Sequence, residues 1–112
     1  MKPLLPTMRE TKRYLVYELL SEQPLGNAQA EVVKHARQAL GLFDSAKAGI
    51  VPVRYDEAVQ AGVLRVAHTS VDKVKAALLL LTEVRGKPVI ARVRTVSGMV
   101  GKARLPTTRS MM

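Results

Sequence analysis

Apolar and polar positions along the chain first predict four strands. Three short apolar runs and one alternating run are typical of strands, and they cover 13–20, 50–55, 63–68 and 89–96. Pro52 lies inside the second run. Because proline has no N–H to donate to a neighbouring strand, that strand should lie at the edge of a sheet or carry a bulge.

Apolar positions with helical spacing predict two helices between these strands. The first helix should begin after Asn27, which is a suitable N-cap, and end at Gly41. The second should be capped by Ser70, run to about Arg85 and stop at Gly86. Each helix is therefore expected to have one apolar stripe that packs on the sheet.

The resulting order of elements is β-α-β-β-α-β. This order is typical of the ferredoxin-like α+β fold, which RNA-recognition (RRM-like) modules share: a four-stranded antiparallel sheet, usually in strand order 4-1-3-2, with two main helices on one face. We therefore expect an N-terminal arm over 1–12, a single domain over 13–98 and a C-terminal tail over 99–112, both ends being basic.

Strand alternation predicts which side chains lie on the sheet face that has no helices. Leu64 and Val66 suit the core, and so do Leu15, Tyr17 and Leu19. The open face should then hold Tyr14, Val16, Glu18, Arg65, Ile90, Arg92, Arg94 and Val96. Arginine on such a face can bind phosphates or stack on bases, although a solvated or protein-covered face is an equal alternative.

Charge strengthens the nucleic-acid interpretation. The chain has 18 Lys and Arg against 9 Asp and Glu, a net charge of +9. The excess lies at the two ends, and residues 84–112 have seven basic residues and no acidic one. In the predicted fold, the start of the first strand lies beside the end of the last, so the two basic blocks should merge into one phosphate-binding region.

The composition also excludes several classes of site. The chain has no Cys, so disulfides, Cys-ligated zinc and thiol nucleophiles are excluded. His35 and His68 are its only histidines, and no carboxylate cluster or glycine-rich phosphate loop is present, so we expect no catalytic residue and no metal or cofactor site. Without a long apolar segment we expect no membrane partner and a cytoplasmic protein. Four aromatic residues are too few for a base-stacking sheet.

Leu79 and Leu80 do not fit the apolar stripe of the second helix. Four consecutive leucines, at 78–81, are more than one stripe can bury. They indicate either a wide buried face or an apolar patch that docks a partner protein.

Four stretches give the chain a resemblance to a known family. They cover 5–14, 41–49, 53–55 with 62–66, and 94–98 with 102–103, and the similarity extends over about residues 5–104, nearly the whole chain. In this order and spacing they resemble the Pop-five family, to which archaeal ribonuclease P protein component 2 belongs. Met99 and Gly101 stand where the family usually has a threonine and a basic residue.

The resemblance implies a non-catalytic subunit of the ribonucleoprotein that removes the 5′ leader from precursor tRNA. In that particle the RNA subunit performs the cleavage with its bound Mg²⁺. Precursor tRNA would be only an indirect partner of this chain. The implied partners are the ribonuclease P RNA and protein component 3, a subunit of the TIM-barrel type, which Leu79 and Leu80 would contact. The residues expected to contact RNA are Arg9, Lys12, Arg13, Tyr14, Arg65, Arg92, Arg94, Ser97, Gly98 and Lys102.

Two other functions are compatible with the same order of elements. A regulatory domain of the ACT type binds small molecules and shares the β-α-β-β-α-β order, but it needs no basic block such as 84–112. A ribosomal or general RNA-binding protein would share the charge, but not the resemblance over nearly the full length.

Overall fold

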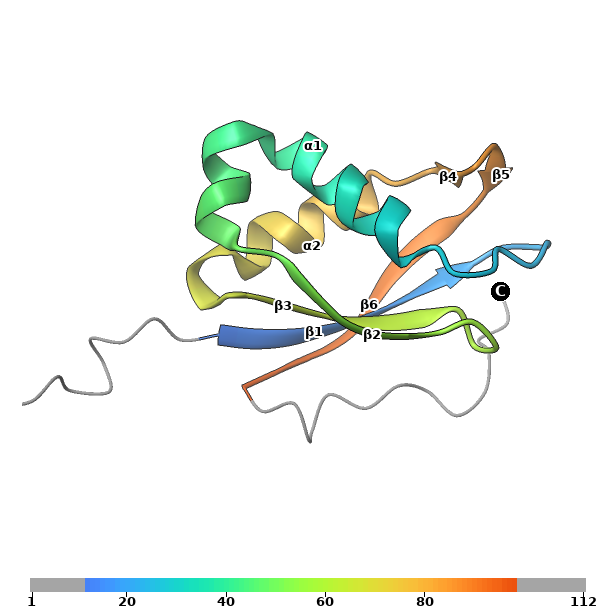
Figure 1. Cartoon of the computed structure of the whole chain (residues 1–112), viewed down its shortest axis with the longest axis horizontal. Helices are drawn as coiled ribbons and strands as arrows, with labels where there is room; N and C mark the ends of the chain where they lie inside the picture. The colour runs from blue at the N-terminus through green and yellow to red at the C-terminus, as the bar shows by residue number, and fades with distance from the viewer. Residues whose placement is uncertain (1–11, 99–112) are drawn as a thin grey trace, which may run out of the picture.

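The structure, a computed structural model, describes residues 12–98 and arranges them as a four-stranded sheet beneath two helices, with a separate two-stranded hairpin (Figure 1). Along the chain the elements are β1 (Lys12–Leu20), α1 (Gln29–Ala48), β2 (Val51–Asp56), β3 (Ala61–Ala67), a 3-10 turn (His68–Ser70), α2 (Val71–Leu79), β4 (Glu83–Val84), β5 (Lys87–Pro88) and β6 (Ile90–Ser97). Four strands pair antiparallel in the order β2-β3-β1-β6. This is the predicted order 4-1-3-2, read from the opposite edge, and the ferredoxin-like α+β fold is confirmed.

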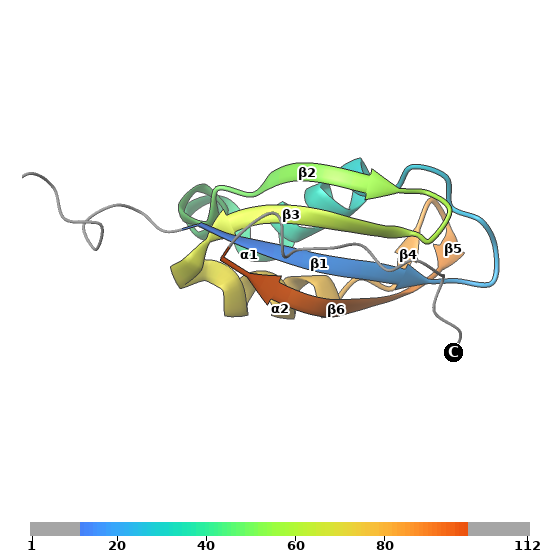
Figure 2. The same cartoon turned by 90° about the horizontal axis from the view of Figure 1, so that it is seen from below.

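The main core lies between the sheet and the helices. Leu15, Tyr17 and Leu19 of β1 are fully buried there, as the alternation predicts. The helices contribute Val32, Val33, Ala36, Val74, Ala77 and Leu78. Full burial of a large aliphatic side chain contributes about 1.5–3 kcal/mol, so these residues hold both helices on one face of the sheet (Figure 2).

A buried polar contact fixes α1 on the sheet. Tyr17 Oη donates to Gln29 Oε1, and Gln29 Nε2 donates to the carbonyl of Arg54, 2.9 Å away. Burial, and secondly the charge of nearby Tyr55, raises the pKa of the Tyr17 hydroxyl well above its usual value, so it stays a donor at neutral pH. Gly62 lies opposite Tyr17, and a Cβ there would approach the Tyr17 oxygen to 2.6 Å. Only glycine fits this position without displacing the contact.

Gly41 interrupts α1 but does not end it, so the predicted end of this helix is wrong. Gly41 has φ 84° and ψ 176°, which kinks the helix, and the helical conformation then resumes as far as Ala48. The true stop is Gly49, whose φ of 55° is the left-handed conformation of a C-cap glycine. Its N–H donates to the carbonyl of Ser45.

Side-chain capping of the helices differs from the prediction. Ala28 occupies the N-cap position of α1, while Asn27, one residue earlier, accepts the N–H of Gln29 at 3.1 Å. Ser70 does occupy the N-cap position of α2, but its side chain makes no capping hydrogen bond. The preceding 3-10 turn leads directly into this helix, and the N–H of Val71 donates to His68.

The predicted length of the second helix is also wrong. It ends at Leu79, and the next residues form the β4–β5 hairpin rather than two further helical turns. Arg85 and Gly86 have φ of 51° and 81°, and two consecutive positive values are what a two-residue hairpin turn of type I′ requires. Leu81 and Val84 are nevertheless buried in the main core, which explains why the apolar pattern continued past the helix.

The β2–β3 pair carries two irregularities. Register shifts between Pro52 and Arg54 on β2, which is an edge strand, so both expectations for this proline are confirmed. Gln60 precedes β3 with a φ of 52° and is buried. Its side chain donates to the carbonyl of Leu19 and accepts the N–H of Leu25, which ties the end of β1 to the following loop.

A bulge between β1 and β6 changes the faces of β6. Val16 lies opposite Thr95 and Tyr17 lies opposite Val93, so Arg94 is an extra residue between the two pairs. Beyond the bulge the alternation reverses. Val96 therefore packs against the main core, and its predicted place beside the arginines is wrong.

Candidate nucleic-acid interface

The sheet face opposite the helices carries a row of three predicted site residues. Tyr14 on β1 lies opposite Arg65 on β3 and opposite Ser97 on β6. Arg65 Nε is buried and has no hydrogen-bond partner within residues 12–98. The structure thus brings together an aromatic ring, a guanidinium and a hydroxyl that are far apart in sequence, on a face that neither α1 nor α2 covers (Figure 2).

A small apolar centre lies next to this row. Val16 and Val63 are fully buried on the open face, and Tyr14 packs against them. The predicted position of Val16 on this face is confirmed. The face is therefore not uniformly charged, and its basic groups stand around an apolar centre.

On the other side of the apolar centre, two arginines share one carboxylate. Glu18 is fully buried, although it lies on the open face. Arg92 contacts Glu18 Oε1 through Nε at 2.9 Å and Nη2 at 2.5 Å, and Arg94 contacts the same oxygen through Nη1 at 3.1 Å. The arginine side chains remain 49% and 41% exposed, so both can also be reached from solvent.

The bulge explains why both arginines reach Glu18. Arg92 lies directly opposite Glu18 in the β1–β6 register, and Arg94 is the inserted residue two positions further along β6. Sequence alternation put all three residues on the open face but gave Glu18 no role. An acidic residue on an otherwise basic face was the signal that could have identified it.

The start of β1 and the end of β6 lie side by side, as predicted. Tyr14 pairs with Ser97, and the Arg13 guanidinium lies 3.6 Å from where a Cβ on Gly98 would stand. Lys12 extends toward the C-terminal end of α1, where its Nζ lies 3.8 Å from the corresponding point on Gly49. Two predicted site residues, Arg9 and Lys102, lie outside the described residues. So do positions 1–11 of the predicted arm and the whole predicted tail, 99–112.

Some basic residues of segment 84–112 make contacts within the domain. Arg85 donates to the carbonyls of Leu25 and Asn27, at 2.7 and 2.6 Å, and contacts Glu31 at 3.0 Å. Lys87 Nζ donates to the carbonyl of Pro24 at 3.0 Å. These contacts anchor the β4–β5 hairpin to the loop between β1 and α1, so Arg85 and Lys87 already have partners within the domain.

Leu79 and Leu80 form an exposed apolar pair at the end of α2. They are 66% and 64% exposed, while their neighbour Leu78 is fully buried. The interpretation of a wide buried helix face is therefore wrong for these two leucines. They remain candidates for contact with another protein.

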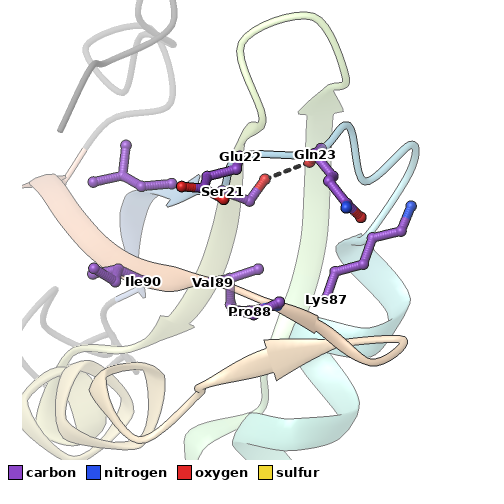
Figure 3. A pocket seen from close by; sticks show the side chains of 8 residues that line it. Ser21, Glu22, Gln23, Lys87, Pro88, Val89 and Ile90 are labelled. Carbon is purple, nitrogen blue, oxygen red and sulfur yellow. Dashed lines mark hydrogen bonds between the residues drawn. The ribbon is translucent and has the colours of Figure 1, made fainter.

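A hollow of about 320 Å³ lies between the end of β1 and the β5–β6 connection (Figure 3). Its lining residues are Leu20, Ser21, Glu22, Gln23, Lys87, Pro88, Val89 and Ile90. Ser21 Oγ donates to the carbonyl of Gln23 at 2.6 Å. The lining holds one carboxylate and no histidine, so it lacks the paired groups that acid–base catalysis uses.

The titratable residues of the described segment, 12–98, form no metal centre. Within residues 12–98, no three His, Asp or Glu side chains gather closely enough to hold a metal ion. His35 instead joins the two helices, with Nε2 2.9 Å from the carbonyl oxygen of Ala77. In the same part of the chain, neither helix has the length and apolar character needed to cross a bilayer.

Comparison with known proteins identifies a family to which this chain is similar. The model of the Rpp14/Pop5 family matches residues 13–106. A ribonuclease P protein component 2 of Thermococcus gammatolerans is 36% identical over 101 residues, which cover 88% of this chain and 84% of the relative. Proteins of the same name from Methanosarcina acetivorans and Methanocaldococcus jannaschii are each 38% identical, covering 92% and 94% of this chain and 78% of each relative.

Proposed function

The chain belongs to the Rpp14/Pop5 family, and from that premise we propose that it is a non-catalytic protein subunit of ribonuclease P. In this role it supports the RNA subunit, which holds the Mg²⁺ and removes the 5′ leader of precursor tRNA. The observation that carries the proposal is similarity, over nearly the whole chain, to several proteins named ribonuclease P protein component 2. The comparisons give no support to the ACT-type alternative.

The open sheet face is the proposed contact with ribonuclease P RNA. Arg92 and Arg94 are about half exposed, and Tyr14 lies in one row with Arg65 and Ser97. A face with one aromatic ring and several guanidiniums suits backbone phosphates better than the stacking of successive bases. The site therefore favours recognition of RNA shape and charge. Arg9 and Lys102, together with Lys12, Arg13 and Gly98, are the proposed extension of this contact.

Leu79 and Leu80 are the proposed contact with a second protein subunit, component 3. Two adjacent exposed leucines at a helix end provide apolar area without polar groups that must be desolvated. They lie on the helix layer, whereas the arginines lie on the opposite face of the sheet. Both contacts can therefore be made at the same time.

A salt titration tests the RNA contact. The full chain is bound to ribonuclease P RNA over a range of salt concentrations, with an unrelated folded RNA of equal length as competitor. If the chain contacts about five phosphates, the logarithm of the binding constant should fall with the logarithm of salt with a slope of roughly −4. A flat response would refute the RNA contact, and equal binding to the competitor would favour a general RNA-binding protein.

A further inference from the structure

Glu18 is the one acidic residue among the buried polar side chains of residues 12–98. Burying a carboxylate is unfavourable unless charged or hydrogen-bonding partners compensate for the lost water. Here two arginines of β6, which lie on the surface proposed to bind RNA, contribute to that compensation. An acid in this position also removes one unit of positive charge from that surface. Its presence there needs an explanation.

The geometry of the three side chains indicates alignment of the arginines. Glu18 Oε1 accepts two N–H groups from Arg92 and one from Arg94, so a single oxygen orients both guanidiniums. Glu18 itself is held by its surroundings, because it is fully buried on β1, an inner strand of the sheet. A free arginine loses rotamer freedom when it binds, and that ordering opposes association. Arginines that are already aligned lose less.

We propose that Glu18 is a positioning residue, which holds Arg92 and Arg94 in a fixed orientation for RNA phosphates. This inference rests on the proposed function as a ribonuclease P subunit. Because both side chains stay about half exposed, each can contact a phosphate while Glu18 orients it.

The proposal and simple charge counting predict opposite effects for Glu18→Gln. This variant keeps the size of the side chain and raises the net charge of the protein by one. Charge alone predicts tighter RNA binding. Positioning predicts weaker binding, by roughly fivefold or more, because ordering each long side chain costs about 0.5–1.5 kcal/mol and two are released. Where the ordering cost exceeds the gain from a phosphate contact, a released arginine no longer binds its phosphate, so fewer phosphates are neutralised and the slope against salt becomes shallower.

Glu57→Gln is the matched control. Glu57 is an exposed residue of the turn between β2 and β3, and its substitution changes the net charge equally without touching Arg92 or Arg94. Its affinity for ribonuclease P RNA should equal or exceed that of the wild type. Titration of each variant with RNA at stoichiometric concentration measures the fraction of active protein, which separates loss of folded protein from loss of affinity. If Glu18 had only a structural role, the slope of binding against salt would stay unchanged.

Glu18→Asp provides a second variant in case Glu18→Gln does not fold. It keeps the charge but shortens the side chain by one methylene. The RNA affinity of Glu18→Asp should therefore lie below that of the wild type. Where Glu18→Gln also folds, the affinity of Glu18→Asp should lie above that of Glu18→Gln. Folded Glu18 variants that bind as tightly as wild type, with an unchanged salt slope, would overturn the positioning role. A wild-type chain that shows no salt-dependent RNA binding would instead overturn the proposed function.

Discussion

Leu78 and Leu79 are adjacent leucines in opposite environments, and alanine substitution of each tests the docking surface. Leu79 is 66% exposed, so a partner could cover about two thirds of the side chain. Full burial of leucine contributes about 1.5–3 kcal/mol, and Leu79→Ala should therefore cost about 1–2 kcal/mol of partner affinity. That is a loss of about five- to thirtyfold.

The same reasoning gives larger effects for stronger changes at this surface. Leu80 is 64% exposed, so the double variant Leu79→Ala/Leu80→Ala should lose about 2–4 kcal/mol. Leu79→Lys should abolish pairing, because docking would desolvate an unpaired ammonium. The monomer should stay folded in each case, since substitutions at exposed positions usually change the free energy of unfolding by less than about 1 kcal/mol.

Leu78→Ala should show the opposite pattern. Leu78 is fully buried in the main core, and truncation of such a leucine destabilises a protein by about 2–5 kcal/mol. The affinity of the remaining folded protein for component 3 should change little. Calorimetric titration of component 3, together with chemical denaturation of each variant, measures both quantities. Unchanged affinity of the folded Leu79→Lys variant would refute the proposed docking surface.

Three further predictions concern contacts inside the domain. Gly62→Ala should destabilise the fold by about 2–4 kcal/mol in chemical denaturation, because its Cβ would displace the Tyr17–Gln29 contact; a change below 1 kcal/mol would contradict the steric argument. Tyr17 contributes stability below about pH 10 that is lost as the pH rises further, since its pKa is raised in the folded state. The wild type should therefore lose stability above pH 10 more steeply than Tyr17→Phe, and parallel curves would contradict this. Arg85→Ala should lower the unfolding free energy by about 1–2 kcal/mol and leave RNA affinity nearly unchanged, whereas a large loss of affinity would place Arg85 in the interface.

The main elements and their order could be predicted because they depend on local periodicity, and the strand pairing followed from the fold that this order is typical of. Leu15, Tyr17 and Leu19 are two residues apart and face the helices as their spacing requires. Pro52 likewise reveals an edge strand through its own missing N–H. Such features need no knowledge of the rest of the chain.

The features that could not be predicted depend on contacts between distant segments. Leu81 and Val84 continue the apolar pattern of α2, so only the tertiary structure shows that they enter the core from a loop and a hairpin. The bulge at Arg94 depends on pairing with β1, and strict alternation therefore misplaced Val96. The burial of Glu18 depends on β6, which lies more than 70 residues away in sequence. The candidate interface was thus predicted as a set of basic residues, but its internal ion pairs were not.

Reconstitution of the particle tests the central claim most directly. The chain, component 3 and the cognate ribonuclease P RNA are mixed, and cleavage of precursor tRNA is followed at low Mg²⁺ with each component left out in turn. For a non-catalytic supporting subunit, cleavage should require the RNA and rise sharply only when both proteins are present. If leaving out this chain does not change the rate, the chain does not support the catalytic RNA and the proposed function is wrong.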